Sequence, residues 1–195
     1  MRRQQGAKAI TIARPAPGDP TNESAAAPQQ TATGPGLLPD PLRPDGRQSD
    51  RASAIARGTT RHLATLGFAV VPEVTLASGH RADLLALGPK GELVIIEVKS
   101  SLADFQSDQK WPAYQEHCDR FSFAVAPDFP LQVLPDEVGV LIADAYGADV
   151  HRAAETFKLP PARRKDVTAR FARTAALRLT AIHDPQALLD APPRL

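Results

Sequence analysis

Short apolar runs separated by glycine- and proline-containing turns dominate the middle of the chain. Five of the seven residues from Glu92 to Val98 are apolar, which is typical of a strand covered on both faces of a sheet. Turns are predicted before this run at Gly88-Pro89-Lys90-Gly91 and further upstream at Ser78-Gly79. Several other short runs have the length and flanking turns of strands. The predicted strands cover residues 68–76, 81–87, 92–98, 121–126, 138–143 and 148–153.

Apolar residues at helical spacing precede the first of these strands. Ser49-Asp50 is a plausible N-cap, and Ile55, Leu63 and Leu66 then recur on one helix face. Gly67 follows the last of them, where a helix commonly ends in a left-handed residue. The pattern predicts a first helix between these limits.

A second helical region follows the strand at 92–98. Ser101 and Asp104 have the spacing of a capping box, so a helix is expected to begin there. Pro112 should end it near Trp111 and begin another helix that runs through His117.

The last predicted helix runs from Arg163 to about Ile182. Phe171, Ala175, Leu179 and Ile182 form one apolar stripe along it. The order of helices and strands predicts an α/β fold in which a mixed sheet is flanked by helices.

Prolines divide the chain into an ordered part and two tails. Eight of the 19 prolines fall before residue 46, among Ala, Gly, Thr and Gln, so residues 1–46 are predicted to be a disordered tail. Its first 18 residues carry four basic side chains and no acid until Asp19. They could act as a weak basic arm for DNA, as a transit-like segment or as a solvated leader. Residues 47–183 are expected to form the domain, and 184–195 to be a frayed C-terminus.

The amino-acid composition excludes several classes of protein. The 195 residues are 43% apolar and carry a formal net charge of +1, which indicates an ordinary globular protein. A single cysteine excludes an internal disulfide framework and a multi-cysteine zinc site. Cys118 stands beside His117, but adjacent helix residues do not face each other, so a buried structural thiol is expected. No apolar run is long enough to span a membrane, and a cytoplasmic location is expected.

The turn at residues 88–91 determines how two acidic side chains meet. Pro89 suits the first position of a three-residue hairpin loop, and Gly91 suits its left-handed position. That loop places Asp83 opposite Glu97, with both side chains on one face of the sheet. A two-residue loop would instead place them on opposite faces.

Two carboxylates that face each other between apolar residues repel and are costly to bury. A hard divalent cation, Mg²⁺ or Mn²⁺, would relieve this repulsion. The predicted metal ligands are Asp83, Glu97 and the carbonyl of Val98, with Lys99 beside the bound water. The alternative is that Glu97 and Lys99 form an ordinary solvated ion pair.

Asp83 and the run Glu97-Val98-Lys99 resemble the motif of the PD-(D/E)xK nuclease superfamily, with Ala82 in place of the motif's proline. The run Ser100–Phe121 is similar to that of the MmcB-like family of bacterial DNA repair proteins. This resemblance implies a restriction-endonuclease-like fold and DNA repair, with DNA and other repair proteins as partners. It also implies that Asp83 and Glu97 bind the metal and that Lys99 orients or polarises the attacking water.

Two further features follow from the resemblance. Lys110 and Tyr114 occupy places like those of the Gln-x-x-x-Tyr motif of RecB-type nucleases, which contacts DNA, although lysine replaces the glutamine. Many superfamily members also carry an acid on the first helix. This chain offers only Asp50 there and Glu73 on the next strand.

Charge is unevenly distributed in the predicted domain. Residues 51–157 contain nine Lys or Arg and 14 Asp or Glu, whereas residues 158–180 contain seven Lys or Arg and one acid, Asp166. Arg163, Arg170 and Arg173 lie on one side of the last helix, which indicates either a DNA backbone contact or a solvated face. Asp104 and Asp108, four residues apart, either shape the edge of the pocket or serve as solvated or capping residues.

The sequence therefore predicts a metal-dependent hydrolase of DNA phosphodiester bonds that acts in DNA repair. Asp83, Glu97 and Lys99 would be its catalytic residues. The alternative is a nuclease-fold module that is inactive and binds DNA or a repair partner.

Overall fold

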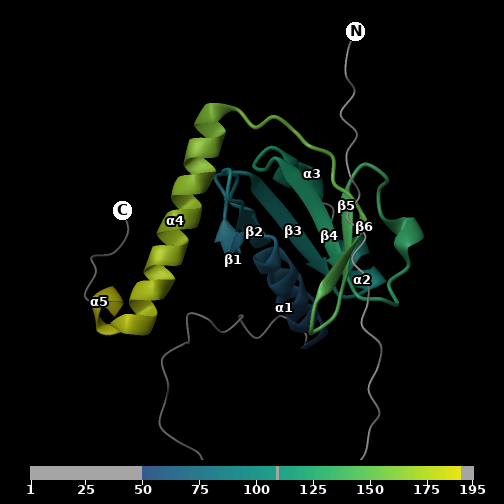
Figure 1. Cartoon of the computed structure of the whole chain (residues 1–195), viewed down its shortest axis with the longest axis horizontal. Coiled ribbons are helices and arrows are strands. Elements are labelled where there is room, and N and C mark those ends of the chain that lie inside the picture. Colours follow the sequence, from purple (N-terminus) through teal and green to yellow (C-terminus); the bar gives the residue numbers. More distant parts are fainter. Residues whose placement is uncertain (1–49, 109, 190–195) are drawn as a thin grey trace, which may run out of the picture. The chain divides into compact units, whose positions relative to one another are not determined.

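The computed structural model describes residues 50–108 and 110–189, which form a six-stranded sheet with helices on both faces (Figure 1). The strands lie side by side in chain order. They are β1 (Ala69–Thr75), β2 (Arg81–Leu87), β3 (Leu93–Lys99), β4 (Arg120–Val125), β5 (Gly139–Ala143) and β6 (Ala148–Arg152). Pairs β3–β4 and β4–β5 are parallel and the other three pairs are antiparallel. The predicted α/β fold with a mixed sheet is confirmed, and each strand lies within one residue of its predicted bounds.

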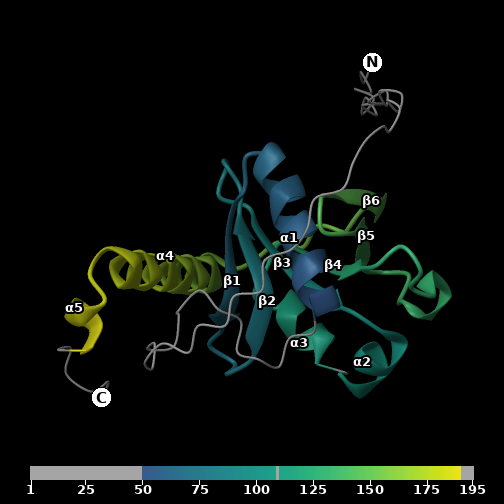
Figure 2. The same cartoon turned by 90° about the horizontal axis from the view of Figure 1, so that it is seen from below.

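The helices divide between the two faces of the sheet. They are α1 (Asp50–Thr65), α2 (Leu102–Ser107), α3 (Trp111–Gln115), α4 (Pro161–His183) and α5 (Gln186–Leu189), with a 3₁₀ turn, η1, at Leu131–Val133. Figure 2 shows α1 on one face and α2 and α3 on the other, with α4 beside the edge strand β1. None of the helices in the described part of the chain is long and apolar enough to cross a membrane.

Side chains along β2 and β3 point alternately to the two faces of the sheet, and each face has its own buried cluster. Leu84 and Ile96 pack in one buried cluster with residues of α1. Leu85 and Ile95 point the other way and pack with residues of α2, α3 and α4. Because both faces are covered, β3 is buried along its whole length. Glu97 and Lys99 therefore lie in a strand that is shielded from water.

Helix α1 ends as its sequence predicts. Gly67 has φ +82°, and its N–H bonds to the carbonyl of Ala64 while the N–H of Phe68 bonds to that of Leu63. These two bonds form a Schellman motif, in which the left-handed residue is usually glycine. Leu66, predicted to lie on the apolar face, is 54% exposed because it belongs to this terminal turn.

The β2–β3 hairpin has the predicted three-residue loop. Gly91 has φ +83°, the N–H of Gly88 bonds to the carbonyl of Glu92 (2.8 Å), and the N–H of Gly91 bonds to the carbonyl of Gly88 (3.0 Å). Leu87 pairs with Leu93, and the pairing continues in the predicted register to Leu84 and Ile96. The rival two-residue loop is thus ruled out.

Helix α2 is shorter than predicted. The Ser101 hydroxyl accepts the N–H of Asp104 (3.1 Å), as expected of an N-cap. The helix nevertheless ends at Ser107 and not near Trp111, because Asp108 adopts an extended conformation and its carboxylate accepts the N–H of Lys110 (3.1 Å). This side chain offers the backbone an alternative to another helical turn.

The apolar stripe predicted for α4 packs along only half of its length. Phe171 is buried and Ala175 packs against the same cluster. Leu179 and Ile182 are 55% and 54% exposed, so the expectation that they pack is wrong. The physical reason is that α4 lies beside the edge strand β1 and its C-terminal part runs beyond the sheet (Figures 1 and 2).

The predicted tails fall mostly outside the described residues. The tail at residues 1–46 and residues 190–195 are not described. Within the region predicted to be a frayed C-terminus, α5 covers Gln186–Leu189.

Candidate functional site

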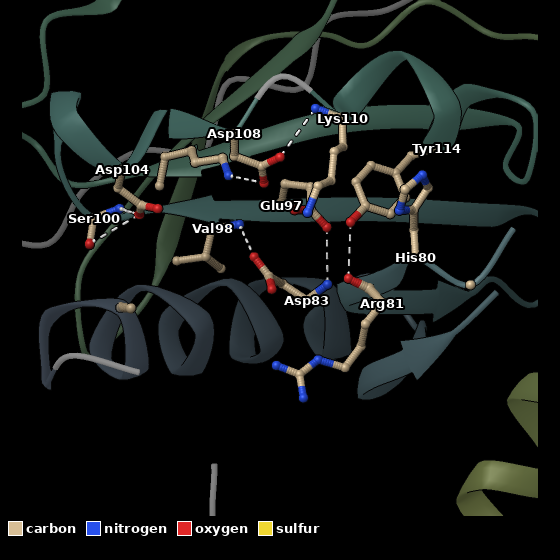
Figure 3. A pocket seen from close by; sticks show the side chains of 13 residues that line it. His80, Arg81, Asp83, Glu97, Val98, Ser100, Asp104, Asp108, Lys110 and Tyr114 are labelled. Carbon is tan, nitrogen blue, oxygen red and sulfur yellow. Dashed lines mark hydrogen bonds and ion pairs between the residues drawn. The ribbon is translucent and has the colours of Figure 1, made fainter. Parts of the chain in front are cut away.

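A polar cavity of about 540 Å³ lies where β2 begins and β3 ends (Figure 3). The predicted metal ligands Asp83, Glu97 and Val98 line it together with Lys99. Other parts of the chain bring further side chains to it. The remaining lining residues are Ala52, Gly79, His80, Arg81, Ser100, Asp104, Asp108, Lys110 and Tyr114.

The carboxylates of Asp83 and Glu97 converge where the β2–β3 ladder ends. Beyond the Leu84–Ile96 pair, the N–H of Asp83 donates to Glu97 Oε1 (3.1 Å) and the N–H of Val98 donates to Asp83 Oδ2 (2.8 Å). Each carboxylate thus accepts a backbone N–H just beyond the end of the ladder. These two bonds hold the acids in place on the predicted common face.

Burial makes the ionised forms of these two acids unfavourable. Loss of hydration raises the pKa of Asp83, although the N–H of Val98 and the charge of Lys99 oppose this. Burial and the negative charge of Asp83 raise the pKa of Glu97 well above its ordinary value. Glu97 is only 3% exposed. The pair therefore favours a positive charge between its oxygens.

The donor set fits a hard divalent cation. Two carboxylates and the carbonyl of Val98 are oxygen ligands of the kind that Mg²⁺ and Mn²⁺ accept, with water completing the shell. Within residues 50–108 and 110–189, no three Asp, Glu, His or Cys side chains are grouped so as to hold a metal ion. Asp83, Glu97 and the carbonyl of Val98 are the residues that could hold such a cation.

The acids considered for the first helix and the next strand do not line the cavity. Asp50 is exposed, and Glu73 forms an ion pair with Arg81 at 3.5 Å. Helix α1 instead contributes Ala52 to the wall. No carboxylate of α1 therefore reaches the site.

Lys99 is a buried cation in the wall of the cavity. Its side chain is 4% exposed, and its Nζ lies 2.8 Å from Asp108 Oδ2. Burial alone would lower the pKa of Lys99, but the hydrogen bond to Asp108 and the charge of Glu97 outweigh it and raise the pKa. The side chain is therefore an ammonium ion at neutral pH.

The two residues compared with the Gln-x-x-x-Tyr motif both line the cavity but differ in exposure. Lys110 is exposed. Tyr114 is 4% exposed, its ring stacks on Phe121, and its hydroxyl donates to the carbonyl of Arg81 (3.0 Å). Tyr114 therefore supports the start of β2, and Lys110 is the one of the two that is open to a ligand.

The three arginines predicted to contact DNA lie on α4 and do not line the cavity. Arg163 pairs with Glu116 (3.3 Å) and Arg170 with Asp166 (2.9 Å), whereas Arg173 is exposed. The structure thus separates these arginines from the residues around Asp83.

Several lining residues had no assigned site role in the sequence. Arg81 is the first residue of β2, and His80 directly precedes it. Asp104 and Asp108 both line the cavity, and both also take part in the ends of α2: the N–H of Asp104 donates to the N-cap Ser101, and Asp108 is the C-cap. Ser100 had no signal of its own, and its N–H and hydroxyl both bond to Asp104.

Cys118 is a structural thiol, as expected. It is fully buried, and burial raises the pKa of its thiol to about 12. Its Sγ donates to the carbonyl of Tyr114 (3.4 Å). A thiolate nucleophile is therefore excluded at this position.

Comparison with known proteins identifies a family. The family described as "DNA repair protein MmcB-like" matches residues 39–186. A solved structure of a protein of unknown function from Silicibacter pomeroyi is 51% identical, with a TM-score of 0.68. The match covers 71% of this chain and 94% of that one. Among curated proteins no significant match is found.

Proposed function

The chain belongs to the MmcB-like family of DNA repair proteins, and we propose that it hydrolyses phosphodiester bonds of DNA with the help of Mg²⁺ or Mn²⁺. Its partners would be DNA and other DNA repair proteins. The observation that carries the proposal is the pair formed by half-buried Asp83 and buried Glu97 at an open cavity, with the pKa of both carboxyls raised. Keeping two repelling acids together costs stability, and a bound cation would offset that cost.

The side chains of this pair would act as ligands. Asp83 and Glu97, with the carbonyl of Val98, would hold the cation, and the two backbone N–H bonds to the carboxylates fix their orientation. When bound, the cation would supply Lewis-acid activation of the phosphate and of the attacking water. The PD-(D/E)xK resemblance assigns the same residues to this role.

Lys99 would act as a fixed positive charge. Phosphodiester hydrolysis places additional negative charge on the phosphorus oxygens, and an ammonium ion in a buried wall stabilises such charge more strongly than one in water. Since its pKa is raised, Lys99 would not serve as a general base near neutral pH. It suits electrostatic stabilisation or orientation of the water.

DNA would approach through the open side of the cavity. Lys110 is an exposed cation there and would contact a backbone phosphate. Arg163, Arg170 and Arg173 on α4 would provide a more distant contact with the same backbone. Of these, Arg163 and Arg170 are already paired with acids, so their share of the affinity should be small.

A cleavage assay tests this proposal. Purified protein with Mg²⁺ or Mn²⁺ is incubated with single-stranded, branched and damaged DNAs, alongside the variant Lys99→Ala. We expect the wild type to cut at least one DNA and the variant to lose about 10²-fold or more in rate. Circular dichroism checks that the variant is folded. Absence of cutting across the panel would reject hydrolysis.

A second candidate is a DNA-binding module without catalysis. It is favoured by Ala52, which offers no metal ligand at the position where α1 reaches the cavity. In the same assay this candidate predicts DNA that is bound and left intact. A mobility shift that depends on Lys110 but requires no divalent cation would support it.

A further inference from the structure

We infer that Asp108 is a positioning residue that holds the ammonium of Lys99 away from Asp83 and Glu97 and thereby keeps these two carboxylates available to a cation. The role of Lys99 in this inference rests on the proposed function, and Asp108 is added as the residue that positions Lys99. No feature of the PD-(D/E)xK motif at residues 83–99 assigns a part to Asp108.

The carboxylate of Asp108 is fixed at both oxygens. Oδ1 accepts the N–H of Lys110 (3.1 Å) and Oδ2 accepts from Lys99 Nζ (2.8 Å). The first bond belongs to the turn that ends α2, so the backbone determines where the second oxygen lies. A long, flexible lysine thus meets a partner that is already in place.

Lys99 has other acids within range of its charge. The charges of Glu97 and Asp104 act on it as well as that of Asp108, and its own charge acts on Asp83. A buried ammonium that lost Asp108 could not remain unpaired and would turn to one of these carboxylates. If it turned to Glu97 or Asp83, it would occupy the place of the cation.

This arrangement separates the ammonium of Lys99 from the cation that would bind at Asp83 and Glu97. Figure 3 shows the side chains of Asp83, Glu97 and Asp108 around the same hollow. The pairing of Lys99 with Asp108 keeps the ammonium off Asp83 and Glu97. These two carboxylates accept backbone N–H groups, and Glu97 also has the Tyr114 hydroxyl as a neutral hydrogen-bond partner. Asp108 therefore acts through Lys99, and not by contact with DNA or metal.

The variant Asp108→Asn tests this because the amide oxygen can still accept the N–H of Lys110 and end α2. Asp104→Asn is the matched control, since it removes an equal charge from the same cavity and can still accept from Ser100. The first readout is the ¹H–¹⁵N ammonium signal of Lys99, identified by its loss in Lys99→Gln. We expect Asp108→Asn to broaden or shift this signal and Asp104→Asn to retain it.

The second readout is the rate of DNA cleavage in a double-mutant cycle. Asp108→Asn should lower kcat about 10- to 100-fold with little change in KM, and should have no further effect in a Lys99→Gln background. An unchanged Lys99 signal in Asp108→Asn, or effects on kcat that multiply, would overturn the inference. If the wild type cuts no DNA, the proposed function fails and the ammonium signal alone decides the role of Asp108.

Discussion

Asp83 and Glu97 repel each other by charge but are held together by hydrogen bonds from backbone N–H groups to their carboxylates. Glu97 accepts the N–H of Asp83 (3.1 Å), and Asp83 accepts the N–H of Val98 (2.8 Å). The strand pair thus stays connected beyond the last ladder position through side chains that repel each other. Such an arrangement is unfavourable for the fold without metal and is suited to a cation.

Neutral replacements of these acids should stabilise the protein without metal. Asp83→Asn and Glu97→Gln keep an oxygen for the backbone N–H and remove a buried charge, so the free energy of unfolding should rise by about 1–2 kcal/mol. Urea unfolding in EDTA measures this.

Asp108→Asn is the control variant, for which we expect the opposite change in the free energy of unfolding. It removes the partner of buried Lys99 and should lower the free energy of unfolding. A loss of stability in all three variants would show that the charge of Asp83 and Glu97 is not a burden on the fold.

Stability without metal should fall as pH rises. The pKa of Asp83 and Glu97 is raised above the ordinary values of 3.8 and 4.5, so their contribution is fully present below those values and is lost as pH passes the higher folded-state values. Added Mg²⁺ should raise the melting temperature more at pH 8 than at about pH 5, because binding requires ionised carboxylates. A Mg²⁺ effect that is independent of pH would contradict this.

The contribution of Asp119 to stability should depend on pH in the opposite sense, because it should be lost as pH falls. Its carboxylate accepts from Arg164 on α4 (2.7 Å) and from the N–H of Leu93 at the start of β3 (2.8 Å). Burial opposes ionisation, but these bonds outweigh it and lower the pKa of Asp119. This contribution is present above the ordinary value of 3.8 and is lost as pH falls through the lower folded-state value.

Asp119→Ala should therefore lower the free energy of unfolding by about 2–4 kcal/mol at neutral pH. The difference from the wild type should shrink in acid, as measured by urea unfolding at several pH values. A difference that stays constant from neutral pH into strong acid would reject the role given to ionised Asp119.

Gly58 should tolerate no side chain although it lies in a helix. A Cβ there would come within 2.0 Å of the carbonyl oxygen of Asp144 and 2.4 Å of that of Gly147, where α1 packs against the β5–β6 turn. Gly58→Ala should thus destabilise the protein by about 2–3 kcal/mol, despite the higher helix propensity of alanine. Gly147→Ala, with open space around its Cβ, should change stability by less than about 0.5 kcal/mol. Equal thermal melting of both variants would contradict the packing described.

Local chemistry explains why the hairpin was predictable. Pro89 and Gly91 specify the loop, the loop specifies the register, and the register brings Asp83 and Glu97 to one face. These steps need only residues close in sequence. The motif resemblance could therefore be placed on a definite geometry before the structure was known.

The surroundings of the site depend on contacts that no local pattern encodes. The early end of α2 follows from the side chain of Asp108, and the burial of Tyr114 follows from the packing of its ring on Phe121 in the core. The exposure of Leu179 and Ile182 depends on where the sheet ends, which the periodicity of α4 does not contain. Likewise, Ala52 joins the cavity only because α1 packs across the sheet.

Calorimetric titration with Mn²⁺ at about pH 8 tests the central claim most directly. We expect the wild type to bind one ion with release of protons, and Asp83→Asn and Glu97→Gln each to lose that binding while remaining folded. Wild-type protein that binds no ion, or variants that bind it as tightly as the wild type, would contradict a cation shared by Asp83 and Glu97.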